Sequence, residues 1–176
     1  MSEIMHRLAQ TIRMERSAFV WMYLNDRATG DAVLLVLVTR FLILLGTGFK
    51  PLGFVTSASG MNIFLQSMLS AFVFWLAYSG VTFAVAKYLF QGGGSYVVIL
   101  RTVGFAFPTM LLILVSRELF SSAFLVLLVG SLWLLAIVSR GLVYEADLDS
   151  NKAVFSAVLG LVGWFIVARV LGWGLI

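Results

Sequence analysis

The stretch from residue 91 to residue 108 reads QGGGSYVVILRTVGFAFP and decides how the rest of the chain is interpreted. It begins with the most polar turn in the apolar part of the sequence, QGGGS at residues 91–95, called the glycine turn below. An apolar helix follows, which carries a charged residue, Arg101, and a helix-breaking residue, Pro108. The charge of Arg101 and the backbone carbonyl that Pro108 leaves without its helical donor both need partners in lipid.

The composition around this stretch is that of a membrane protein. Of the 176 residues, 61% are hydrophobic and 11% are charged, whereas a soluble domain is about half apolar and about a quarter charged. The chain is therefore predicted to be an all-α integral membrane protein without a separate soluble domain. Cysteine is absent, which excludes disulfides and thiolate chemistry. We expect no nucleic-acid binding, because no soluble basic surface surrounds the net charge of +4.

Residues 1–30 form the one sizeable polar segment. Ile4, Leu8 and Ile12 recur at helical spacing, and a second apolar patch at residues 18–24 follows Ser17, a predicted N-cap. This pattern predicts one or two amphipathic helices at the cytoplasmic membrane surface. A secretory signal is not expected, since the apolar patch is short and no small-residue cleavage site follows it.

Residues 31–176 are predicted to form a five-span membrane domain. A span needs about 20 apolar residues to cross about 30 Å of hydrocarbon. The predicted spans cover residues 32–49, 62–88, 96–116, 122–138 and 153–173. The loop before the last span, Tyr144–Lys152, is the most acidic stretch of the chain.

The distribution of basic residues predicts an N-in, C-out orientation, because lysine and arginine concentrate on the cytoplasmic side. In that orientation the inner side holds Arg7, Arg13, Arg16, Arg27, Lys87, Arg140 and Lys152. The outer side holds Lys50, Arg117 and Arg169. The glycine turn and the acidic loop then face the cytoplasm together.

Three features resemble the Yip1 domain family over roughly residues 17–176. They are the sequence SAFVWMYLNDRATGDA at residues 17–32, the glycine turn followed by RTVGF at 101–105 and Pro108, and the charged loop before Lys152-Ala153. Eukaryotic members are Golgi and endoplasmic-reticulum proteins that bind Rab-type GTPases and each other. Their Asp-Leu-Tyr-Gly-Pro motif does not occur in this sequence, so the chain is most similar to the short bacterial members. The resemblance implies a bacterial inner-membrane protein with membrane-protein partners or a homo-oligomeric state.

Two arginines fall inside predicted spans. Arg101 lies six residues past Ser95, about 9 Å into the membrane, and Arg40 lies nine residues past Asp31, about 13 Å in. Such an arginine costs at least ~2.5 kcal/mol on insertion scales, so it faces partners or extends toward the headgroups. For Arg101 both interpretations stay open, and for Arg40 we favour a position facing the bundle.

No acidic residue lies inside a predicted span, so the arginines need partners from outside. We predict that the acidic loop folds under the bundle and that one of its carboxylates meets Arg101 or Arg40. Lys87, beside the glycine turn, would extend this cluster into a site for a partner or a lipid headgroup. In the alternative, both arginines reach lipid phosphates. The candidate acids are Glu145, Asp147 and Asp149, with Asp31 at the head of the first span.

Two patterns predict helix shape and packing. Pro108 crowds the carbonyl of Gly104, which predicts a fixed kink in preference to a moving hinge. In the last span, small residues at i, i+3, i+4, i+7 and i+10 predict close contact with another helix. This stripe consists of Ala153, Ser156, Ala157, Gly160 and Gly163.

The residue types exclude most catalytic chemistry. The chain contains a single histidine, His6, and the predicted spans contain no carboxylate, so neither acid–base pairs nor metal sites are expected. The glycine turn lacks the Gly-Lys-Ser/Thr ending of a phosphate-binding loop. We therefore expect a non-enzymatic protein without cofactors that organises membrane partners. The alternative is a small transporter or channel component with the arginines on an anion path.

Overall fold

The computed structural model describes residues 2–48, 60–120 and 122–170, which form helices joined by short turns. Helix α4 continues into a π-helical turn, Val85–Leu89, and a 3₁₀ turn, Phe107–Leu111, joins α5 to α6. The helices are α1 (Ser2–Ile12), α2 (Arg16–Leu24), α3 (Arg27–Gly46), α4 (Gly60–Ala84), α5 (Tyr96–Ala106), α6 (Leu112–Leu119), α7 (Ala123–Glu145) and α8 (Ser150–Val170).

Five helical segments in the described part of the chain are long and apolar enough to cross a membrane. They are Arg27–Gly46, Ile63–Leu89, Tyr96–Leu119, Leu125–Glu145 and Ser150–Val170. The prediction of an all-α integral membrane protein with five candidate spans is therefore confirmed. Residues 49 and 171–173, which the predicted first and last spans include, lie outside the described residues.

Two predicted span boundaries were wrong. The first span begins at Arg27 instead of residue 32, because Thr29, Gly30 and Asp31 belong to the helix. Helix α7, which contains the fourth predicted span, runs to Glu145, seven residues past the predicted end. Ser139 does not end α7, since its hydroxyl donates to the Leu135 carbonyl oxygen at 2.7 Å within the same helix. The connection between α7 and α8 is consequently short.

The centre of the bundle is filled by aromatic side chains. The Phe74 ring stacks on Tyr78 with centroids 5.5 Å apart and meets Phe107 and Trp164 edge-on at 5.8 and 5.2 Å. The indole nitrogen of Trp75 donates to the Leu100 carbonyl oxygen at 2.7 Å, which ties α4 to α5. Aromatic pairs of this geometry stabilise a core beyond their buried area.

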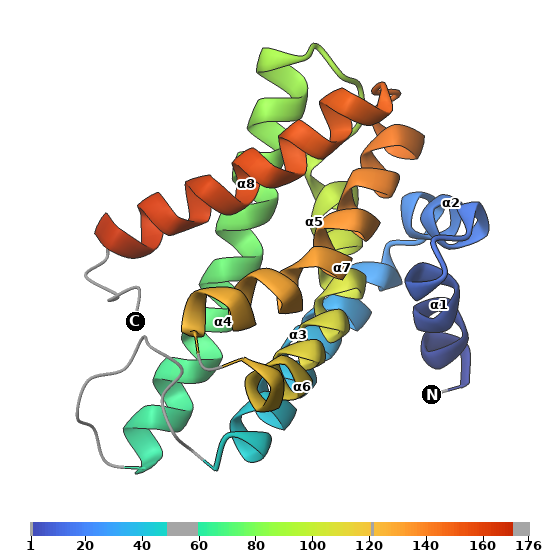
Figure 1. Cartoon of the computed structure of the whole chain (residues 1–176). Helices are drawn as coiled ribbons and strands as arrows, with labels where there is room; N and C mark the ends of the chain where they lie inside the picture. Colours follow the sequence, from blue (N-terminus) through green and yellow to red (C-terminus); the bar gives the residue numbers. More distant parts are fainter. Residues whose placement is uncertain (1, 49–59, 121, 171–176) are drawn as a thin grey trace.

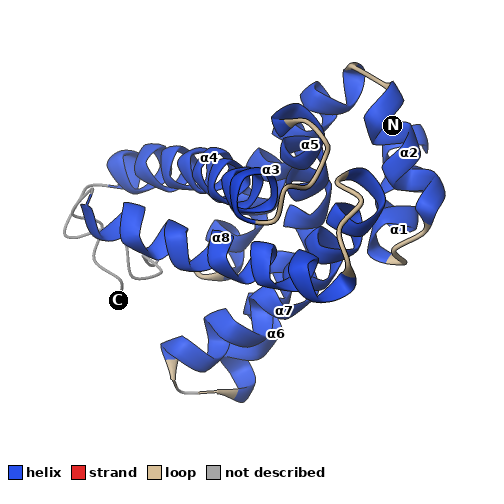
Figure 2. Cartoon of the chain, turned by 90° about the horizontal axis from the view of Figure 1, so that it is seen from above, coloured by secondary structure: helices blue, strands red, loops and turns tan. Residues whose placement is uncertain are grey.

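Helices α1 and α2 lie at one side of the bundle, away from α4 (Figures 1 and 2), where they contact α5 and α7. Ala18, Phe19 and Met22 on the inner face of α2 are buried. Phe19 reaches α7 at Gly141, where an added Cβ would lie 3.2 Å from its ring. The helix begins at Arg16, so Ser17 is not its N-cap. The amphipathic prediction for residues 1–30 did not anticipate this packing.

The helix that starts after the glycine turn changes its hydrogen bonding at Pro108. The 3₁₀ turn Phe107–Leu111 contains this proline, and the Thr109 hydroxyl donates to the Ala106 carbonyl oxygen at 2.7 Å. Gly104 packs against Ala32 of α3, and an added Cβ there would also lie 3.2 Å from the Trp75 indole nitrogen. Gly104 therefore allows a close α3–α5 contact just before the interruption.

The two glycines of the small-residue stripe of α8 lie against α4. An added Cβ at Gly160 would meet Thr82 and lie 3.0 Å from the Tyr78 ring, and one at Gly163 would lie 2.6 Å from Val81. Ala153, Ser156 and Ala157 are fully buried. The backbones approach closely here because the α8 residues have small side chains or none.

Candidate functional site

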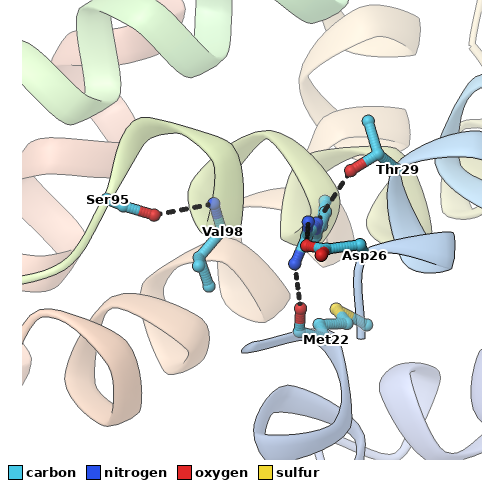
Figure 3. A network of polar contacts seen from close by, with 6 residues as sticks. Met22, Asp26, Thr29, Ser95 and Val98 are labelled. Carbon is cyan, nitrogen blue, oxygen red and sulfur yellow. Dashed lines mark hydrogen bonds and ion pairs between the residues drawn. The ribbon is translucent and has the colours of Figure 1, made fainter. Parts of the chain in front are cut away.

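Arg101 is buried and binds three groups of the α2–α3 region. Its Nε donates to the Thr29 hydroxyl, Nη1 to the Met22 carbonyl oxygen and Nη2 to Asp26 Oδ1, each at 2.8 Å. In Figure 3, Met22, Asp26 and Thr29 converge on this point beside α5. We call this set of contacts the Arg101 clasp.

Two helix ends explain why the clasp forms at this place. Met22 lies in the last turn of α2, where carbonyl groups have no partner within the helix, and a cation interacts favourably with that end. Asp26 precedes α3, and Thr29 lies in its first turn. At the start of α5, Ser95 caps the helix by accepting a hydrogen bond from the Val98 amide at 3.4 Å (Figure 3). Arg101 therefore joins the end of one helix, the start of another and α5.

The predicted partners of Arg101 were wrong. Its carboxylate partner among the described residues is Asp26, and no ion pair there joins Arg101 or Arg40 to Glu145, Asp147, Asp149 or Asp31. The physical reason is that α2 occupies the space beside Arg101, whereas α7 continues to Glu145 and leaves the later acids exposed at the end of the bundle. Asp149 instead pairs with Lys152 at 3.6 Å.

Glu145 still belongs to the surroundings of the clasp. Its Oε1 accepts a hydrogen bond from the Thr102 hydroxyl at 2.8 Å, and its buried Oε2 has no hydrogen-bond partner among the described residues. Because Thr102 follows Arg101, two successive residues of α5 bind two different carboxylates. The contact turns the Glu145 side chain toward the bundle.

Arg40 and Lys87 lie in separate environments. Arg40 is half-buried, and its Nε donates to the Ser67 hydroxyl at 2.8 Å, which links α3 to α4. Because α3 begins at Arg27, Arg40 lies in its second half, about 16 Å along the helix from Thr29. Lys87 is exposed, with its Nζ 5.2 Å from the Phe83 ring centroid. The predicted single cluster is therefore wrong, since the three basic residues contact different groups.

The glycine turn packs on the end of α7. The Gly93 amide donates to the Ala146 carbonyl oxygen at 2.9 Å, and the Gly92 amide donates to the Ala86 carbonyl oxygen at 2.9 Å. Gly94 has a φ of +87°, and an added Cβ would lie 3.0 Å from the Glu145 carbonyl oxygen. Glycine is required here for conformation and for close approach. The glycine turn and the acidic loop thus lie at the same end of the bundle.

We expect Gly94→Ala to lower the free energy of unfolding by at least about 1–2 kcal/mol, the cost of a left-handed conformation for a residue with a Cβ. Gly30→Ala is the matched control, because Gly30 lies within α3 and no described residue outside its own helix turn lies within 4 Å of an added Cβ. That substitution should be neutral or stabilising by up to ~1 kcal/mol. Thermal unfolding in detergent measures both, and equal melting temperatures for the two variants would contradict the proposed packing of the turn.

The sequence prediction missed Met22, Asp26, Thr29 and Thr102. Asp26 carried a usable signal, since Asn25-Asp26 is the polar break between two apolar helices. The Met22 contact uses a backbone carbonyl, which residue identity does not reveal.

Among the described residues, no three His, Cys, Asp or Glu side chains are placed to hold a metal ion. The clasp can fix helices in place and neutralise a buried charge.

Comparison of the chain with protein-family models, with curated proteins and with solved structures gave no match.

Proposed function

We propose that this chain is a non-enzymatic, Yip1-like integral membrane protein of the bacterial inner membrane that organises membrane-protein partners. The observation that supports this most is the Arg101 clasp. On an anion path, an intramembrane arginine must be free to meet the substrate. All three guanidinium nitrogens of Arg101 instead donate hydrogen bonds within the chain. An arginine held in this way supports a fixed scaffold.

Co-purification from native membranes in mild detergent tests the proposal. Reproducible recovery of defined membrane proteins, or of further copies of the chain, is expected with the wild type and not with an unrelated five-span protein of similar abundance. Chloride and phosphate flux should be measured in parallel in proteoliposomes of the purified chain. The expected flux equals that of protein-free liposomes. Saturable anion flux without recovered partners would contradict the proposal and favour a transporter.

We also propose the N-in, C-out orientation, on the basis of the basic-residue distribution. A reporter that is active only in the cytoplasm should be silent when fused after Ile176 and active when fused before Met1. The same reporter inserted after the exposed Asp147, in the connection between α7 and α8, is expected to be active. Cytoplasmic activity of the C-terminal fusion would contradict this orientation.

A further inference from the structure

Arg16, Arg140 and Tyr144 form a surface cluster where α2 meets α7, called the arginine–tyrosine cluster below. The Cζ atom of Arg140 lies 4.8 Å from the Tyr144 ring centroid, and that of Arg16 lies 5.9 Å from the same centroid. Both arginines are exposed. One aromatic ring therefore holds two cations from different helices, and each contact is attractive for the guanidinium.

The cluster has no counter-anion among the described residues. Neither arginine forms an ion pair there. The Glu15 carboxylate lies 4.0 Å from Arg13, and Glu145, next to Tyr144, turns its carboxylate inward to Thr102. Two like charges near one ring repel each other. An anion from outside would relieve this repulsion, and the planar guanidinium group matches phosphate oxygens in geometry and charge.

The neighbouring side chains show which phosphate the cluster fits. On α2, Val20 and Tyr23 follow Arg16 at i+4 and i+7 on its exposed face and are 46% and 59% exposed. On α7, Trp133 precedes Arg140 by seven residues and is 45% exposed. Each helix thus presents an exposed aromatic side chain on the face that also carries an exposed arginine. Arginines beside exposed aromatic side chains are typical of a membrane–water interface, where the arginines reach the headgroups.

We infer that the arginine–tyrosine cluster binds the phosphodiester of an anionic lipid headgroup. Arg16 and Arg140 donate to the phosphate oxygens, Tyr144 holds both guanidinium groups in place, and the acyl chains lie along the exposed apolar residues of α2 and α7. Arg140 is five residues before the end of α7, about 7.5 Å along the helix, which places it near headgroup depth. The inference requires neither the proposed organising function nor the proposed orientation.

Native mass spectrometry of the purified full chain, titrated with phosphatidylglycerol or phosphatidylcholine, tests this inference. The wild type should bind phosphatidylglycerol more tightly. Removing each arginine charge should weaken that binding about fivefold, so R16Q/R140Q should lose roughly thirtyfold. The control is R117Q, because Arg117 is an exposed arginine in the last turn of α6. It should keep wild-type affinity, and inorganic phosphate should not displace the bound lipid.

Three results would overturn the inference. They are equal binding of the two lipids by the wild type, unchanged phosphatidylglycerol binding by R16Q/R140Q, and displacement of the lipid by inorganic phosphate, which would identify a soluble-anion site. Thermal unfolding in phosphatidylcholine checks that the variants are folded. If R16Q/R140Q does not fold, the single variant R140Q replaces it, with the expected loss of about fivefold.

Discussion

Replacing Arg101 with methionine should lower the free energy of unfolding by about 1–3 kcal/mol, the cost of leaving a buried hydrogen-bond acceptor without its donor. Methionine has similar length and removes the donors to Met22, Asp26 and Thr29. The Met22 carbonyl oxygen would lose its guanidinium donor at a residue that is fully buried. Denaturation by sodium dodecyl sulfate in mixed micelles, followed by tryptophan fluorescence, measures the change.

Two further variants separate the parts of the clasp. Arg101→Lys keeps the charge but not the planar group that reaches three partners. Its free energy of unfolding should therefore lie between those of the wild type and Arg101→Met. Asp26→Asn should cost at most about 1 kcal/mol, since the Asp26 side chain is fully exposed. Arg117→Met is the control, because Arg117 is exposed in α6. If Arg101→Met were no less stable than this control, the clasp would not contribute to stability.

Gly160→Leu is expected to have the second large effect, a loss of at least about 3 kcal/mol or a failure to recover folded protein. A Cβ at this position would already overlap Thr82, and the rest of the leucine would enter space filled by the Tyr78 ring. Neither neighbour can withdraw easily, because both are fully buried in α4. The leucine would therefore force α4 and α8 apart at this small-residue contact.

Val162→Leu is the matched control for Gly160→Leu. Val162 lies on the same helix two residues away and is 47% exposed, so one added methylene can extend away from the bundle. Expression level and thermal unfolding in detergent compare the two variants. Equal yields and equal melting temperatures would show that α8 does not depend on close contact at Gly160.

The helical class and the apolar spans followed from composition and from the lengths of the apolar runs. The span boundaries did not, because a polar residue near the end of a membrane helix need not end it. Ser139 satisfies its hydroxyl within α7, and Arg140 lies over the Tyr144 ring. Thr29 likewise continues α3 because its hydroxyl accepts a hydrogen bond from Arg101. These contacts depend on neighbours that a single helical pattern does not include.

The site was predictable only in part. The cost of a charge in lipid left two interpretations open for Arg101, and the structure shows its guanidinium group bound to partners within the chain. Their identity depended on α2, whose residues Ala18, Phe19 and Met22 turn inward and bring the α2–α3 turn next to α5. The amphipathic pattern predicted a helix but not its packing partner. The position of Arg40 was counted from Asp31, whereas α3 begins at Arg27, so Arg40 lies farther along its helix than that count gave.

The most direct measurement of the Arg101 clasp uses the absence of cysteine in the chain. Ala18→Cys places one thiol on the inner face of α2, where the alanine is fully buried, and Ser17→Cys places one at an exposed polar position of the same helix as a reference for reagent access. A hydrophilic maleimide should label residue 18 slowly when Arg101 is present. It should label the Arg101→Met variant at least about tenfold faster, since release of α2 costs less free energy without the clasp. Equal labelling rates at residue 18 with and without Arg101, with Ser17→Cys reacting readily in both, would contradict the role of Arg101 in holding α2 to the bundle.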